Sequence, residues 1–104
     1  MKQSKQRKLG KAGWKVGSAA EFLNLSQAES ELIEMRIALG RTLRVLRTRR
    51  GLTQAQAAAH LSSSQSRLAK MESADPSVTI DLLIRSLVAL GATRKQVAKA
   101  IGTG

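Results

Sequence analysis

Apolar side chains recur every three or four residues over most of the chain, which is the spacing of an amphipathic helix. Between residue 26 and about residue 50 the apolar stripe consists of Leu32, Met35, Leu39, Leu43 and Leu46. A second stripe consists of Ile80, Leu83, Ile84, Leu87 and Val88. No segment alternates apolar and polar residues with the period of two that a half-buried strand requires. The pattern therefore predicts an all-α chain.

Local start and stop signals divide this pattern into elements. Capping boxes, in which Ser or Thr is followed three residues later by Glu or Gln, begin at Ser18, Ser26, Thr53 and Thr93. Glycine is common just after a helix end, and Gly51 and Gly91 follow the two stripes. Inside the first stripe, Gly40 marks either a bend or a close contact. We expect a short helix at residues 18–24, followed by five helices at about 26–50, 53–61, 64–73, 80–90 and 93–101.

The charge is strongly basic and is arranged in blocks. Eighteen Lys and Arg residues against seven Asp and Glu give a net charge of +11. Residues 1–15 and 36–50 contain bases and no acid, whereas residues 16–35 contain acids and no base. An excess of positive charge of this size favours the phosphates of a nucleic-acid duplex as a partner. Binding to single strands is less favoured, because the chain has only one Trp and one Phe on which bases could stack. Residues 1–17 are predicted to be a flexible basic arm, either a phosphate-seeking tail or a solubilising terminus. Residues 18–36 are predicted to be a helical extension together with the start of the first long helix, and residues 37–104 to be the main domain, which contains the two short helices at 53–61 and 64–73.

The composition also excludes several classes of protein. The absence of Cys excludes a disulfide scaffold and a thiolate zinc site, and a single His with scattered acids offers no metal site, cofactor site or catalytic cluster. We therefore expect a protein that is not an enzyme. No apolar run is long enough to span a membrane, and the basic N-terminus lacks the apolar stretch of a secretory signal. The expected location is the cytoplasm.

The two short helices at residues 53–61 and 64–73 have the proportions of a helix-turn-helix, predicted at residues 53–73. Leu68 and Met71 are three residues apart and are predicted to face inward. That leaves an outward face with Gln65, Ser66, Ala69 and Lys70, with Arg67 at its edge. Glutamine can pair with adenine, and Arg or Lys with guanine, whereas the alternative is an ordinary polar helix surface.

Three motifs in order carry a family resemblance: Leu43-Arg44-Val45-Leu46-Arg47, then Gly51-Leu52-Thr53-Gln54, then Ser64-Gln65-Ser66-Arg67-Leu68-Ala69-Lys70-Met71-Glu72. Over about residues 37–90 the chain resembles the phage-repressor-like (Cro/repressor, xenobiotic-response-element or XRE) helix-turn-helix family. The resemblance implies a lambda-repressor-like domain of five helices. It places Ser64, Gln65, Ser66 and Arg67 at the DNA surface, Gln54 at phosphate and against the recognition helix, and Arg47 in an ion pair with Glu72. Ser62 and Ala74 stand where the family commonly has Gly.

A further resemblance covers nearly the whole chain. The segments Gly13-Trp14-Lys15-Val16-Gly17, Phe22-Leu23-Asn24-Leu25-Ser26 and Asp75-Pro76-Ser77-Val78 are similar to HigA-like antitoxins. Such proteins repress their own operon and neutralise a ribonuclease toxin. The expected function is a sequence-specific regulator that binds a double-stranded DNA operator as a homodimer and represses its own gene. The alternative is an antitoxin that neutralises a small basic toxin of the RelE/HigB-like type through its N-terminal segment.

Overall fold

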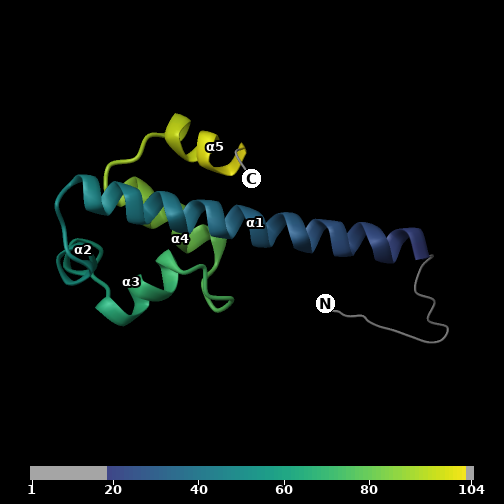
Figure 1. The fold of residues 1–104 in the computed structure, drawn as a ribbon, viewed down its shortest axis with the longest axis horizontal. Helices are drawn as coiled ribbons and strands as arrows, with labels where there is room; N and C mark the ends of the chain where they lie inside the picture. Colours follow the sequence, from purple (N-terminus) through teal and green to yellow (C-terminus); the bar gives the residue numbers. More distant parts are fainter. Residues whose placement is uncertain (1–18, 103–104) are drawn as a thin grey trace. The chain divides into compact units, whose positions relative to one another are not determined.

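The computed structural model describes residues 19–102, with side chains from residue 26 onward. Within these residues the structure consists of five α-helices and no strand, so the predicted all-α fold is confirmed (Figure 1). The expected basic arm at residues 1–17 lies outside the described residues, as does the first predicted cap, Ser18. The helices are α1 (Ala19–Arg49), α2 (Gln54–His60), α3 (Gln65–Glu72), α4 (Ile80–Ala89) and α5 (Arg94–Gly102).

The first helix is longer than the sequence predicts. The expectation of a separate short helix at residues 18–24 is wrong, because α1 runs without a break from Ala19 to Arg49 and Ser26 lies inside it. No Gly or Pro occurs between residues 19 and 39, so each of these residues can continue the helical hydrogen-bond ladder. A serine inside a helix costs only about half a kcal/mol relative to alanine, so the capping signal at Ser26 is overridden.

The boundaries of the shorter helices follow from their caps. Thr53 accepts from the backbone N–H of Gln56 while the Gln56 side chain accepts from the backbone N–H of Thr53, which makes the predicted capping box of α2. Ser64 and Thr79 cap α3 and α4, each accepting one backbone N–H at 3.1 Å through the side-chain oxygen. These bonds satisfy amides that would otherwise lack an acceptor at the first turn.

Contacts group the chain into residues 1–31 and 32–104, and the hydrophobic core lies in the second group. Its largest fully buried side chains come from α1, α3 and α4: Leu39, Leu43, Leu68, Met71, Leu83 and Leu87. In this group α5 lies on one side of α1, and α2 and α3 lie on the other (Figure 1). The two predicted stripes extend past the core, since Leu32 and Val88 remain 45% and 52% exposed.

Gly40 marks a close contact and not a bend. A Cβ at this position would lie 2.6 Å from the carbonyl oxygen of Met71 and 3.1 Å from that of Glu72, both backbone atoms at the end of α3. Glycine therefore allows the backbones of α1 and α3 to approach each other. Among residues 19–102, no helix is both long enough and apolar enough to cross a membrane.

Candidate nucleic-acid interface

Helices α2 and α3 form a helix-turn-helix whose inner side is apolar. Ala57 and Ala58 of α2 are buried, and their small side chains let α3 pack closely against the helix. Leu68 and Met71 anchor α3 in the core, with exposures of 0% and 1%. Because these two residues fix the inward side of α3, its opposite side faces solvent.

The solvent side of α3 carries the residues that the sequence predicts for DNA contact. Gln65, Ser66, Arg67 and Lys70 are all exposed. Ser64 precedes the helix, and its hydroxyl oxygen accepts from the backbone N–H of Arg67. The structure thus brings five of the expected residues together on one helix and its cap.

The turn before α3 adopts a backbone conformation that normally favours glycine. Ser62 has a φ of +52°, and Ala74, just after α3, has a φ of +58°. Both are positions at which the phage-repressor-like family commonly has Gly, and both keep the left-handed geometry with a side chain present. Both residues therefore hold this left-handed geometry at some cost in strain.

A polar network fastens the end of α3 to α1 and α2. Arg47 donates through Nε to Glu72 Oε2 at 2.5 Å and through Nη2 to Glu72 Oε1 at 3.2 Å. The two side chains are 11% and 5% exposed. Arg47 Nη1 also donates to the Leu52 carbonyl oxygen at 2.8 Å, and Gln54 Nε2 donates to Glu72 Oε1 at 3.1 Å. Arg47 and Glu72 are thus in contact, and Gln54 is held against α3 through the same carboxylate.

One polar residue beside α3 was missed by reasoning from sequence. Ser77, in the loop between α3 and α4, joins Ser64, Ser66, Arg67 and Lys70 in lining a shallow hollow of about 310 Å³. Its hydroxyl donates to Asp75 Oδ2 at 3.2 Å. In the sequence, Asp75-Pro76-Ser77 is typical of a loop between helices, and nothing in the local pattern predicts that this loop lies beside α3.

The electrostatics of this face suit a polyanion. Arg67 and Lys70 form no ion pair with a carboxylate in the part of the chain that the structure describes. The acids at the end of α3 and in the loop after it have other partners, since Glu72 binds Arg47 and Asp75 accepts from the Ser77 hydroxyl at 3.2 Å. The two cations are therefore available to phosphate oxygens.

The described residues contain no group of three or more His, Asp or Glu side chains that could hold a metal ion. Their one His, His60, is exposed at the end of α2. The arrangement on α3 therefore offers hydrogen bonding and charge, on an open surface.

No curated protein and no solved structure matches the chain significantly. A family model described as a helix-turn-helix domain matches residues 38–102. This match runs from within α1 to the end of α5 and covers more than half of the 104 residues. The chain therefore belongs to the helix-turn-helix domain family.

Proposed function

We propose that this protein is a sequence-specific regulator of transcription that inserts α3 into the major groove of double-stranded DNA. The observation that carries the proposal is the exposed face of Gln65, Ser66, Arg67 and Lys70, presented by a helix whose other side is anchored in the core. A helix of this kind fits the major groove, where base edges present a distinct pattern of donors and acceptors.

The residues divide into two roles by chemistry. Gln65, Ser66 and Arg67, in the first turn of α3, are assigned to base edges, because the first turn of a recognition helix enters the groove most deeply. Gln54, Ser64 and Lys70 are assigned to phosphates, which position the domain without selecting a sequence. The hydroxyl of Ser77 lines the same hollow and is added to the phosphate group.

The protein is proposed to act as a homodimer on a two-fold-related operator. The two α3 helices of such a dimer enter the groove about 34 Å apart, one turn of DNA. The promoter of its own gene is the proposed operator, as expected of an autorepressor. The two-fold axis of the dimer would then coincide with the two-fold axis that relates the two half-sites of the operator.

Fluorescence anisotropy with the promoter duplex and a scrambled duplex tests the proposal. Gln65→Ala should weaken binding to the promoter by about 1–3 kcal/mol and leave binding to the scrambled duplex nearly unchanged. Gln27→Ala is the matched control, because Gln27 is an exposed helical glutamine on α1 outside the helix-turn-helix. Equal losses on both duplexes would remove Gln65 from the base-reading set, and equal wild-type affinity for both would refute sequence-specific regulation.

An antitoxin is the second candidate function. The observation favouring it is an exposed acidic part of α1, with Glu29, Glu31 and Glu34 beside Leu32 and Ile33, which are 45% and 52% exposed. Such a surface suits a small basic toxin of the RelE/HigB-like type. Co-expression with the product of the adjacent gene tests it: a stable complex that is lost in a Glu29→Lys/Ile33→Lys variant supports the antitoxin role, and no association refutes it.

A further inference from the structure

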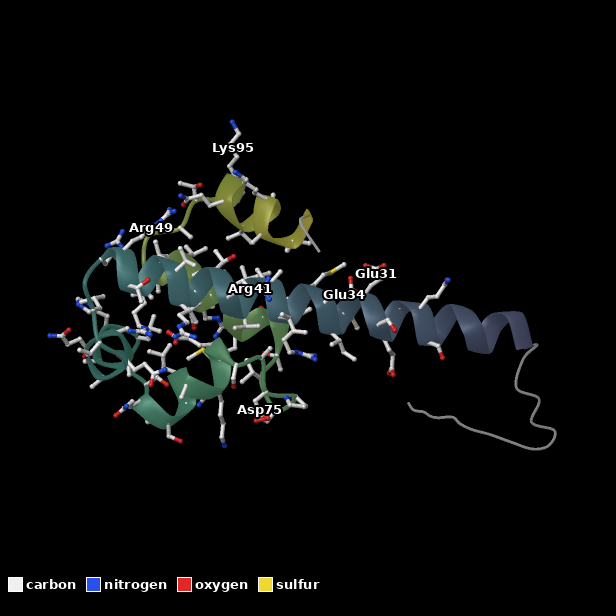
Figure 2. All side chains as sticks on the ribbon, in the orientation of Figure 1. Glu31, Glu34, Arg41, Arg49, Asp75 and Lys95 are labelled. Atoms are coloured by element: carbon white, nitrogen blue, oxygen red, sulfur yellow. The ribbon has the colours of Figure 1, made fainter. Side chains whose placement is uncertain are left out.

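A second hollow of the group formed by residues 32–104 lies away from α3. It is a groove of about 300 Å³ between α1 and α5, on the side of α1 opposite α3 (Figure 1). Figure 2 shows Arg49 on the side of α1 where α5 lies, and Asp75, in the loop after α3, on the other side. A partner bound in this groove would therefore leave α3 free. The lining comes from α1, α5 and the loop before α5: Thr42, Val45, Leu46, Arg49, Ala92, Gln96, Lys99 and Ala100.

The groove has an exposed apolar floor about two helical turns long. Val45 is 42% exposed although it is aliphatic, and the small side chain of Ala92 stands on the other wall. From Thr42 to Arg49 the α1 wall advances by seven residues, or about 10 Å. This length suits the recognition mode in which a short amphipathic segment places one apolar side chain per turn into a groove.

The polar groups of the lining that remain free are donors. The Thr42 hydroxyl already donates to a backbone carbonyl of its own helix at 2.9 Å, and Gln96 Oε1 already accepts from the backbone N–H of Thr93 at 2.8 Å. The Gln96 amide N–H groups, the Arg49 guanidinium and the Lys99 ammonium have no partner in the part of the chain that the structure describes. Because arginine and lysine can only donate, a ligand that satisfies this groove must supply acceptors.

The charge around the groove is of one sign. No acidic side chain lines it among the described residues, and the sequence ranges that hold its walls, 36–50 and 82–104, contain bases and no acid. Arg50 adds a further cation at the end of α1: its Nη2 lies close to where a Cβ of Gly91 would stand, so the guanidinium covers the glycine next to Ala92. Carboxylates are therefore the complementary acceptors, whereas a second copy of this same surface would be repelled.

An acidic protein segment fits the groove better than a nucleic acid does. Phosphates would satisfy the donors but would leave the Val45 floor uncovered, and no aromatic side chain among the described residues lines the groove for a base to stack on. An aliphatic side chain flanked by carboxylates satisfies both the floor and the donors.

We propose that the groove between α1 and α5 binds an acidic amphipathic segment of another protein. An aliphatic side chain of the segment packs against Val45, and its carboxylates bind Arg49 and Lys99. The proposal requires only the groove, so it does not rest on DNA reading by α3. It also differs from the acidic surface of α1 that is assigned to a basic toxin, because this groove would repel a basic protein.

Peptide selection on the full chain tests the predicted chemistry. A phage-displayed library of random peptides about 15 residues long, roughly four helical turns, is selected on the immobilised protein. Sequences that carry Asp or Glu beside aliphatic residues at helical spacing should be enriched. Fluorescence anisotropy then measures the affinity of the most enriched peptide for the wild type and for each variant.

Charge reversal locates the binding site. Arg49→Glu/Lys99→Glu should weaken peptide binding about tenfold or more, because carboxylates of the peptide then face carboxylates of the groove. Arg94→Glu/Lys95→Glu is the matched control: it changes the net charge equally at exposed positions of α5 outside the lining, and its affinity should stay within about threefold of the wild type.

An apolar substitution provides an independent arm. Val45→Lys should weaken peptide binding about fivefold or more through loss of the apolar floor, although it adds positive charge and would strengthen a purely electrostatic contact. Val88→Lys is its matched control, because Val88 is an exposed valine on α4 outside the groove. Circular dichroism establishes that each variant is folded.

The other outcomes overturn the proposal. Enrichment of no acidic peptide does so, as does equal weakening by the two charge-reversal variants or binding that tolerates Val45→Lys. A tenfold loss of affinity for the scrambled duplex confined to Arg49→Glu/Lys99→Glu would assign the groove to nucleic acid. Wild-type self-association that this variant abolishes would assign it to a second copy. Gln65→Ala should leave peptide binding unchanged, so failure of DNA reading and failure of the groove appear in separate assays.

Discussion

Two ion pairs among the residues that the structure describes have similar lengths but very different surroundings, which leads to a quantitative prediction. Arg47 and Glu72 meet at 2.5 Å with side chains 11% and 5% exposed. Arg85 and Asp81 meet at 2.7 Å with side chains 75% and 78% exposed. If burial decides the energetic effect of breaking an ion pair, removal of one partner should be costly in the first pair and nearly neutral in the second.

The structure gives the expected magnitude. Glu72→Ala leaves the Arg47 guanidinium inside the domain with the Leu52 carbonyl as its remaining acceptor, and Gln54 loses its acceptor as well. An uncompensated buried charge typically costs about 3–5 kcal/mol. Total unfolding free energies are roughly 5–15 kcal/mol, so this substitution should remove a large fraction of the stability. Arg85→Ala should cost about 0.2–1 kcal/mol.

Urea denaturation followed by far-ultraviolet circular dichroism measures both losses. A double replacement, Arg47→Met/Glu72→Met, separates loss of the pair from the penalty of a stranded charge. It should be more stable than Glu72→Ala, because no charge remains buried without a partner. The reasoning is refuted if Glu72→Ala destabilises the domain no more than Arg85→Ala does.

Three further predictions concern single positions. Gly40→Ala should destabilise the domain by about 1–3 kcal/mol despite the better helix propensity of alanine, because the added Cβ meets backbone oxygens of α3. Gly102→Ala is the control and should not destabilise the domain, because a Cβ added there has no atom within 4 Å. Denaturation midpoints distinguish the two. Lys70→Ala should lower the slope of log affinity against log salt by about 1, whereas Lys95→Ala on α5 should leave it unchanged. Thr79→Ala should cost about 1 kcal/mol in urea titrations through loss of the α4 cap, and an unchanged midpoint would contradict that role.

The helix boundaries that sequence predicts well are those with a side-chain cap or a glycine. Thr53 begins α2 as its capping box predicts, and Gly51 follows α1 with a φ of +69°. The signal at Ser26 fails because a capping box is four residues long and says nothing about the helix that precedes it. Where the preceding residues also favour a helix, the helical hydrogen bonds continue through the capping-box motif.

At the candidate site, the Arg47–Glu72 contact is implied by the family resemblance, whereas the sequence pattern by itself identifies single positions better than contacts. The outward face of α3 follows from the inward positions of Leu68 and Met71, because the period of the helix relates the two sides. The proximity of Ser77 to α3 depends on the path of a loop, which has no period. The left-handed geometry of Ala74 is likewise invisible in the residue itself, since alanine seldom adopts it and about 1–2 kcal/mol of strain must be met by surrounding contacts.

The close approach at Gly40 has a consequence for the residues that the proposed function assigns to base edges. Gly40 and Arg47 are two helical turns apart on α1, and both contact the end of α3, one at its backbone carbonyls and the other at the Glu72 side chain. Contacts with the backbone and with a side chain together prevent α3 from rotating about its own axis. A rotation of one residue, about 100°, would move Gln65 from the outward face and bring a neighbour into its place. Under the proposed function, the side chains that α3 presents to DNA therefore depend on contacts with α1 as well as on the buried Leu68 and Met71.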